Sequence, residues 1–174
     1  MAQTTQNEII ADGLRLSIGL GEKLLDGVTS DIFGRLGNSG GTTVNSNHGA
    51  FIYGHLAFYA PRVIQMTGGP RTSSPDGFAE LFADGVACVD DVDGTHYPDM
   101  KLITEAFFNG YNAALEAVIA ASPDVLDQPN PTGGSLTEKF PTIGSMCGFM
   151  SCGHIMLHMG QMSAWRRMQG LGPA

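Results

Sequence analysis

His154 and His158 are four residues apart in a stretch whose apolar spacing predicts one long helix, Ile143 to Gln169. Their imidazoles therefore leave the same helix face about one turn apart. Imidazole nitrogen is a ligand for zinc, nickel, copper and iron, so this pair can chelate a metal ion without deforming the backbone. Two ligands rarely complete a metal site, and a third must come from elsewhere in the chain. The other histidines are His48, His55 and His96.

His55 is the histidine best placed to complete such a site. It lies on a predicted helix that ends near Met66, within the face that the apolar residues of this helix would bury. We therefore expect His55 to meet the helix of His154 and His158. His48 is close to the start of its helix, where we expect a capping or solvent-facing role. His96 lies in a loop and is not expected to be a ligand.

A hydrogen-bonded pair of core or rim histidines is the alternative interpretation, because one such spacing can arise by chance among five histidines. Cys147 could be a fourth ligand, but a buried free cysteine is more often a small apolar side chain, and we favour that interpretation. Gln161 follows His158 by about one turn and could orient a ligand or simply face water. The methionines of this helix are interpreted as adaptable core rather than copper ligands, because they spread around the helix.

Metalloprotease chemistry would need a glutamate directly after the first histidine, as the base that deprotonates a metal-bound water. The residue at that position is Ile155. Any general base must therefore come from another helix. Glu105 and Glu116 on the predicted third helix are candidates by residue type alone.

Composition sets limits on the fold and the partners. The chain has 174 residues, 43% of them hydrophobic and 15% charged, which fits a single domain over residues 1–174. A net charge of -8, with no basic cluster larger than Arg166-Arg167, argues against nucleic acid and anionic membranes as partners. No secretory leader, membrane-spanning stretch or closely paired cysteines are found in the sequence. We therefore expect a soluble cytoplasmic protein with free thiols.

Helical periodicity predicts four long helices and no extended sheet. The predicted helices span residues 5–36, 45–66, 98–121 and 143–169, and the run Asn45-Ser46-Asn47 is expected to cap the second of them. Glycines inside the first helix, such as Gly13 and Gly21, require close neighbours, and Pro61 predicts a kink or an early end of the second helix. The connections 67–95 and 124–141 are long, and the first contains one helical turn near 78–82. These lengths allow a parallel pair and predict an all-α four-helix bundle with long crossover connections.

Three segments, in this order along nearly the whole chain, carry a resemblance to a known family. They are Phe51-Ile-Tyr-Gly-His55-Leu, Tyr97-Pro-Asp-Met, and His154-x3-His158-Met-Gly-Gln161 running into Trp165-Arg-Arg-Met-Gln-Gly170-Leu-Gly-Pro. In these segments the chain resembles the DinB/YfiT-like metalloenzymes, a superfamily of DinB-like domains.

The resemblance implies a bundle of down-up-up-down type with a divalent metal held by one histidine of the second helix and two of the fourth. Carried over to this chain, the ligands are His55, His154 and His158. Family members of known activity use low-molecular-weight thiols such as mycothiol or bacillithiol, in transferases and isomerases. Family sequences often carry Glu where this chain has Ile155, so hydrolytic chemistry is not carried over with the ligands.

The function expected from the sequence is a metal-dependent enzyme. Zinc or nickel on the three histidines would activate a thiol or a water for group transfer, as in a thiol transferase or a hydrolase, with a small molecule as substrate. The alternative is a non-catalytic bundle in which the metal only joins the second helix to the fourth. A dimeric scaffold that uses an outer apolar helix face is a further alternative, and we expect a homodimer.

Overall fold

The computed structural model describes residues 4–173, which form a mostly helical structure. The helical elements are α1 (Gln6–Leu24), α2 (Ser30–Phe33), α3 (Gly49–Met66), α4 (Phe78–Phe82), α5 (Met100–Ala120), α6 (Pro123–Leu126), α7 (Gly134–Lys139), α8 (Ile143–Gly148), the π-helical turn η1 (Phe149–Gly153) and α9 (His154–Met168). Strands β1 (Gly37–Ser39) and β2 (Thr42–Val44) pair antiparallel, with Gly37 opposite Val44. The predicted all-α class is confirmed, and the small hairpin is an addition that the sequence did not predict.

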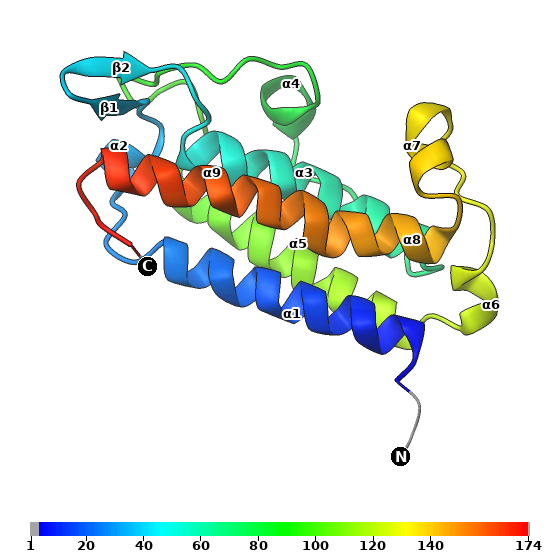
Figure 1. The fold of residues 1–174 in the computed structure, drawn as a ribbon. Helices are drawn as coiled ribbons and strands as arrows, with labels where there is room; N and C mark the ends of the chain where they lie inside the picture. The colour runs from blue at the N-terminus through cyan, green and yellow to red at the C-terminus, as the bar shows by residue number, and fades with distance from the viewer. Residues whose placement is uncertain (1–3, 174) are drawn as a thin grey trace.

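Four long segments lie side by side: α1, α3, α5 and the continuous run α8–η1–α9 (Figure 1). Helices α3 and α5 run in one direction and pack on each other, whereas α1 and α9 run in the opposite direction. The parallel pair is possible because the long connection between α3 and α5 returns the chain to the end where α3 began. This arrangement places α3 in contact with α9, so the helices that carry the candidate ligands are neighbours.

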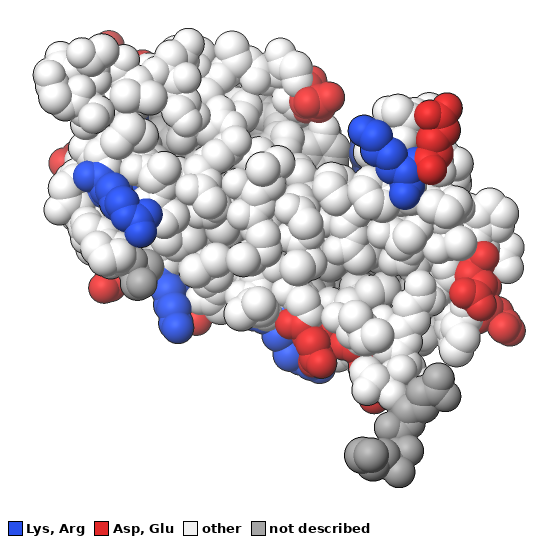
Figure 2. Space-filling view, viewed as in Figure 1, with Lys and Arg blue, Asp and Glu red and all other residues white. Residues whose placement is uncertain are grey.

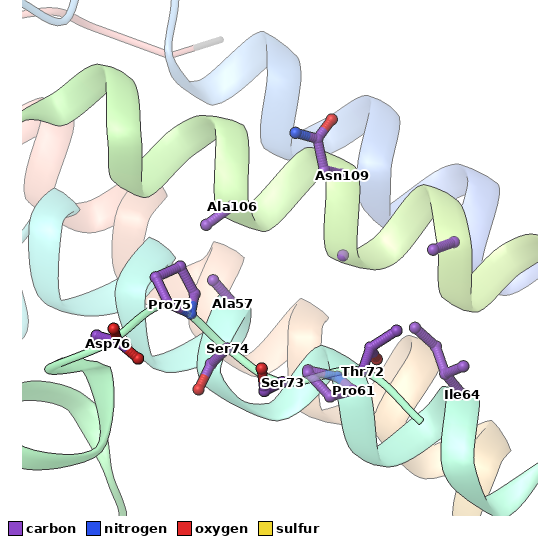
Figure 3. A pocket seen from close by; sticks show the side chains of 12 residues that line it. Ala57, Pro61, Ile64, Thr72, Ser73, Ser74, Pro75, Asp76, Ala106 and Asn109 are labelled. Atoms are coloured by element: carbon purple, nitrogen blue, oxygen red, sulfur yellow. The ribbon is translucent and has the colours of Figure 1, made fainter. Parts of the chain in front are cut away.

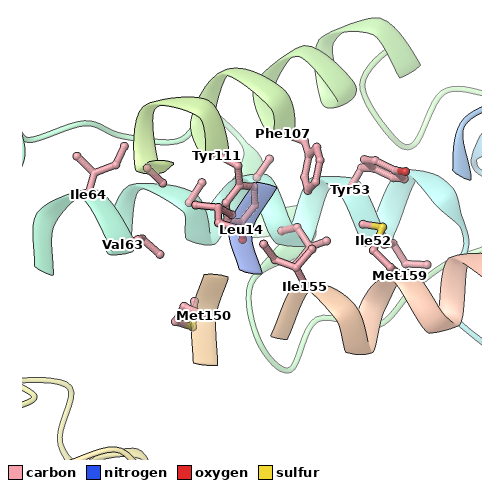
Figure 4. Close-up of a cluster of buried hydrophobic side chains, with 14 of the residues drawn as sticks. Leu14, Ile52, Tyr53, Val63, Ile64, Phe107, Tyr111, Met150, Ile155 and Met159 are labelled. Atoms are coloured by element: carbon pink, nitrogen blue, oxygen red, sulfur yellow. The ribbon is translucent and has the colours of Figure 1, made fainter. Parts of the chain in front are cut away.

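The hydrophobic core lies between these helices and takes side chains from each of them (Figure 4). Leu14 of α1, Tyr53 of α3, Phe107 of α5 and Met159 of α9 are fully buried. The rings of Tyr53 and Phe107 meet edge to face with their centroids 5.0 Å apart. Each large side chain buried in this way contributes about 1.5–3 kcal/mol. Packing of the apolar faces therefore holds the long helices together.

Glycines in α1 allow close packing, as the sequence predicted. A Cβ atom at Gly21 would lie 3.1 Å from the ring of Phe107, and one at Gly13 would lie 3.2 Å from the Cβ atom of Cys152. Gly27 has a φ angle of 72°, in the left-handed region that favours glycine. The chain leaves the helix before this residue, so α1 ends at Leu24 and the prediction of a first helix to residue 36 is wrong.

The start of α3 also differs from the prediction. The residues at positions 45–47 were expected to cap this helix, but the N-cap is His48, whose ring Nδ1 accepts a hydrogen bond from the backbone N–H of Phe51 at 3.2 Å. Of the two roles expected for His48, the capping role is therefore confirmed. Pro61 does not end α3, which runs to Met66 as predicted. Helix α5 begins at Met100, two residues later than expected.

The connections carry more structure than the sequence indicated. The helical turn α4 lies where the prediction placed it, and α6 and α7 lie within or at the edge of the segment predicted as a second loop. No helix within residues 4–173 is both long and apolar enough to cross a membrane. On the face shown in Figure 2, charged side chains lie around the margin, and the middle of α9 carries none.

Candidate metal centre

Three histidines from two helices converge between α3 and α9. One ring nitrogen from each of His55, His154 and His158 lies within 4.8 Å of the other two. The Nε2 atoms of His55 and His154 are 3.2 Å apart, and the ring centroids of the three pairs are 4.7, 4.9 and 5.2 Å apart. His55 and His158 are each only 8% exposed. The structure thus brings together the three residues that the sequence selected, in a group that could hold a metal ion.

His55 is oriented by the backbone at the end of α4. Its Nδ1 atom lies 2.8 Å from the carbonyl oxygen of Phe82. A carbonyl oxygen can only accept, so Nδ1 carries the ring hydrogen and donates it. The Nε2 atom of His55 therefore keeps its lone pair and directs it toward the other two histidines. This is the tautomer that a metal ligand needs.

His158 is oriented by a side-chain amide. Its Nδ1 atom lies 3.0 Å from Oε1 of Gln161, which also accepts a hydrogen bond from Nδ2 of Asn47 at 3.1 Å. The amide oxygen accepts from both groups, so Nδ1 of His158 is a donor and Nε2 keeps its lone pair. Gln161 thus has the orienting role that was one of two sequence interpretations. Asn47, expected as a helix cap, instead holds Gln161 in place.

His154 faces His55 through Nε2, while its Nδ1 atom is buried and has no hydrogen-bond partner within residues 4–173. Burial, followed by the neighbouring charges of His158, His55 and Arg62, lowers the pKa of this ring to about 3. Burial, followed by His55, lowers the pKa of His158 to about 4. Burial also lowers the pKa of His55. All three rings are therefore neutral near pH 7, which is the form that binds a metal.

The donor set fits a divalent cation. In the neutral rings, the Nε2 atoms of His55 and His158 have no hydrogen, and His154 can offer at most one hydrogen to the two of them. A hydrogen-bonded cluster would thus leave a converging lone pair without a partner, which is costly in a buried site. One cation would satisfy all three nitrogens, and three imidazoles are a ligand set used for zinc.

A π-helical turn positions His154. Residues Phe149–Gly153 form η1, and His154 is the first residue of α9, so the predicted single α-helix from 143 to 169 is interrupted. A π-turn accommodates one residue more than an α-turn and changes the rotation of the residues before it relative to those after it. Met150 and Ser151 of η1 are buried, and the histidines after it face α3. Such turns are frequent at functional sites.

A cavity of about 220 Å³ adjoins the histidines. Its lining includes His55 and His154, so two of the three candidate ligands border a space that a small molecule could enter. The other lining residues are Tyr59, Arg62, Asp84, Leu136, Met146, Phe149 and Met150. The wall is thus largely apolar, with two charged side chains and one phenol. A metal ion that served only to join two helices would not need this opening.

A larger cavity of about 520 Å³ lies elsewhere, between α3, α5 and the segment 72–76 (Figure 3). Its lining consists of small, apolar and hydroxyl side chains with Asp76 and Asn109, and it contains none of the three histidines. Because the imidazole cluster borders the smaller cavity and not this one, we assign the chemistry to the smaller cavity.

The remaining residues considered from the sequence lie apart from the cluster. His48 is the buried N-cap of α3, and His96 is exposed. Cys147 is fully buried, which raises its pKa to about 12, so it has the apolar role favoured from the sequence. Glu105 is exposed and pairs with Lys101 at 3.8 Å on α5. Glu116 lines a different cavity, so neither glutamate reaches the histidines as a general base.

Arg62 lines the cavity and, like Tyr59 and Asp84, was not predicted from the sequence as a site residue. It follows His55 by seven residues on α3, and Tyr59 lies between them, so the three side chains share one helix face. The spacing of four and three residues is the sequence signal that could have placed Tyr59 and Arg62 beside His55.

The chain matches no family model and no curated protein. The candidate centre is therefore defined by the three rings, the groups that orient them and the adjoining cavity.

Proposed function

We propose that the chain is a metal-dependent enzyme in which His55, His154 and His158 hold a divalent ion, with zinc or nickel as the first candidates. We also propose that its long helices form the four-helix bundle of the DinB/YfiT-like metalloenzymes. The parallel pair α3 and α5, flanked by α1 and α9 running the other way, supports this assignment. The observation that carries the metal proposal is the convergence of three neutral ring nitrogens within 4.8 Å.

The reaction proposed is group transfer that uses a low-molecular-weight thiol. A divalent ion on three neutral imidazoles keeps its positive charge and lowers the pKa of a bound thiol or water. Ile155 is fully buried, neither Glu105 nor Glu116 lines the cavity, and the one carboxylate that does, Asp84, is exposed to water rather than buried beside the histidines. A thiol with a pKa near 8.5 reaches its anionic form near neutral pH without a carboxylate base. A water depends more strongly on a general base to remove its proton. The residues present therefore favour a thiol over a water as the nucleophile.

The hydroxyl of Tyr59 is placed to donate a hydrogen bond into the cavity. Its Oη atom accepts a hydrogen bond from the backbone N–H of Asp84 at 3.0 Å, and its ring lies beside His55 with the centroids 4.9 Å apart. Because Oη accepts from Asp84, its own hydrogen is available to a group in the cavity. We propose that Tyr59 donates a hydrogen bond to the substrate next to the metal-bound thiol.

The alternative is a metal that only stabilises the contact between α3 and α9. The cavity that borders His55 and His154 favours the enzyme, because a purely structural site is closed by its protein ligands. The two functions differ in whether an added thiol reaches the ion.

Metal content is the first test of the proposal. Protein purified without a histidine tag, loaded with zinc and freed of excess ion, should hold one zinc per chain. His154→Ala should hold little or none, whereas His96→Ala, which removes an exposed histidine outside the cluster, should match the unchanged protein. Equal zinc in both variants would refute the three-histidine site.

Thiol access is the second test. Cobalt(II) in place of zinc reports its ligands through visible and near-ultraviolet absorption. A thiol that binds the ion should add an intense thiolate-to-cobalt band, because soft sulfur ligands coordinate such ions well. A spectrum that stays constant with every thiol, together with normal cobalt content, would support the purely structural metal instead.

A further inference from the structure

Arg62 presents a positive charge at the rim of the metal-facing cavity. Its guanidinium carbon lies 4.9 Å from the centre of the Tyr59 ring, over the ring face. The ion pairs found within residues 4–173 involve Arg15, Arg35 and Lys101 and leave Arg62 without an acidic partner. Its side chain also donates no hydrogen bond to the protein in that part of the chain. All of its N–H donors are therefore available to a ligand.

The geometry of α3 aligns Arg62 with the metal ligands. His55, Tyr59 and Arg62 are spaced four and three residues apart and all line the same cavity. Seven residues of α-helix correspond to about 10 Å along the axis. Long helical side chains lean toward the N-terminus of the helix, so the guanidinium leans back toward His55, as its position over Tyr59 shows. A ligand atom at the histidines and a second group at Arg62 are thus within the span of one small molecule.

The charge of the cavity favours an anion. Arg62 and Asp84 are the two charged side chains in its lining, and they form no ion pair with each other. The charges of these two side chains sum to zero, so a divalent ion on neutral histidines gives the cavity a net positive charge. The net charge of the whole chain is -8. A planar guanidinium binds a carboxylate through two parallel hydrogen bonds. Met150 and Phe149 also line the cavity and supply apolar surface for the carbon chain of such a molecule.

We infer that the cavity selects a thiol that also carries a carboxylate. The sulfur binds at the three-histidine centre, the apolar chain lies along Met150 and Phe149, and the carboxylate binds Arg62. This inference rests on the proposed function and adds the class of thiol and the residue that selects it. Arg62 is a specificity-determining residue in this account and takes no part in holding the metal.

A matched pair of thiols tests the inference. The compounds 6-mercaptohexanoate and 6-mercaptohexanol share the sulfur and the chain, and differ in whether the far end is a carboxylate. Their affinities for the cobalt(II) protein are measured from the thiolate-to-cobalt band. The acid should bind about tenfold more tightly than the alcohol, the factor expected for hydrogen bonds to a charged group.

Variants assign this preference to one side chain. Arg62→Gln should reduce the preference for the acid to about twofold or less. Arg62→Lys should retain part of the preference, because the positive charge stays while the paired N–H donors of the planar guanidinium are lost. Arg71→Gln is the matched control, since Arg71 is also exposed and does not line this cavity. It should keep the full tenfold preference. Cobalt content should be the same in all of these proteins.

The inference is overturned if the acid and the alcohol bind the unchanged protein equally, or if Arg62→Gln keeps the preference. Failure of the underlying function gives a different result. In that case the unchanged protein takes up no cobalt, or neither thiol alters its spectrum, and both the function and the inference fall. Cobalt uptake with thiol bands but no preference would refute the inference alone.

Discussion

At the scale of single residues, the three rings of the cluster differ in what fixes them. The carbonyl of Phe82 orients His55. The amide of Gln161 orients His158. Nδ1 of His154 is buried with no such partner within residues 4–173. Partners of this kind fix the tautomer of a ligand and raise its basicity. The fold alone therefore fixes the orientation and the metal-binding tautomer of two of the three rings.

Gln161→Ala should weaken metal binding without abolishing it. The variant removes the acceptor that holds the Nδ1 hydrogen of His158, and loss of such an orienting partner lowers metal affinity by about 10- to 100-fold. A competition assay with a zinc-sensitive dye measures the change. Gln128→Ala is the control, because Gln128 is exposed and its side chain donates a hydrogen bond only to the carbonyl of Asp124. Unchanged zinc affinity in Gln161→Ala would show that the contact has no part in the site.

The ligand candidates could be predicted from the sequence, and Gln161 was one candidate for an orienting partner, but the other orienting contacts could not be predicted. The spacing of His154 and His158 places them on one face, and His55 lies on the apolar face of its own helix. By contrast, the carbonyl that fixes His55 is 27 residues away in the chain, and Asn47 is 114 residues from Gln161. A backbone carbonyl has no sequence signature, so only the tertiary structure reveals it.

At the scale of elements, the sequence predicted the long helices better than the irregular ones. Apolar periodicity locates α3, α5 and the run α8–η1–α9 within a few residues. It does not show the π-turn η1, because the turn needs one additional residue rather than a particular residue type. The hairpin of β1 and β2 has only three residues per strand, with most of its side chains exposed, so it has no buried face that alternation could reveal.

Two glycines of α1 provide a test of helix packing. Both Gly19→Ala and Gly21→Ala gain helix propensity of about 1 kcal/mol. At Gly19 the added Cβ meets nothing within 4 Å, whereas at Gly21 it lies 3.1 Å from the ring of Phe107. Gly19→Ala should therefore stabilise the protein by about 0.5–1 kcal/mol. Gly21→Ala should be less stable than Gly19→Ala in urea unfolding, and equal stabilities would show that α1 and α5 are not in close contact there.

The cap of α3 predicts a pH dependence of stability. His48 Nδ1 accepts from Phe51 and its Nε2 lies 2.9 Å from the carbonyl of Val89, so the folded state needs the neutral ring, and burial lowers its pKa. Below a pH of about 6.5, the unfolded chain binds a proton that the folded state excludes. Stability is thus full above about pH 6.5 and falls as the pH drops toward the folded pKa, by at most about 1.4 kcal/mol per pH unit for one group.

His48→Asn isolates this contribution. Asparagine keeps a capping acceptor for α3 but does not titrate. Urea unfolding at pH 7.5 and pH 5.5 should show a smaller loss of stability for His48→Asn than for the unchanged protein. The cluster histidines titrate in both proteins and cancel in the comparison. An equal loss in both would mean that the ring of His48 is not held neutral by its cap position.

At the scale of the whole molecule, α3 and α9 are neighbours before any metal is considered. Their contact forms part of a core to which α1 and α5 also contribute, including Leu14, Tyr53, Phe107 and Met159. The long connections that allow this arrangement were predicted from their length, whereas the packing of particular helices required the structure. The metal-free chain should therefore be folded, unlike small domains that depend on zinc for their core.

Zinc should stabilise this folded chain by binding only to the native state. At a free concentration about 100-fold above the dissociation constant, binding adds about 2.7 kcal/mol to the free energy of unfolding. Thermal unfolding should show a higher Tm with zinc and a return to the metal-free value with a chelator. His154→Ala should show no zinc-dependent shift. A Tm that is independent of zinc in the unchanged protein would contradict binding at the native cluster.

X-ray absorption spectroscopy of the zinc-loaded protein tests the central claim most directly, because it reports the atoms around the ion. The account predicts three imidazole nitrogens about 2.0–2.1 Å from zinc and one exchangeable ligand, which becomes sulfur when a thiol is added. The imidazole signal should weaken in His55→Ala. Zinc surrounded by oxygen atoms alone, or an imidazole signal that is unchanged in His55→Ala, would contradict a centre built from His55, His154 and His158.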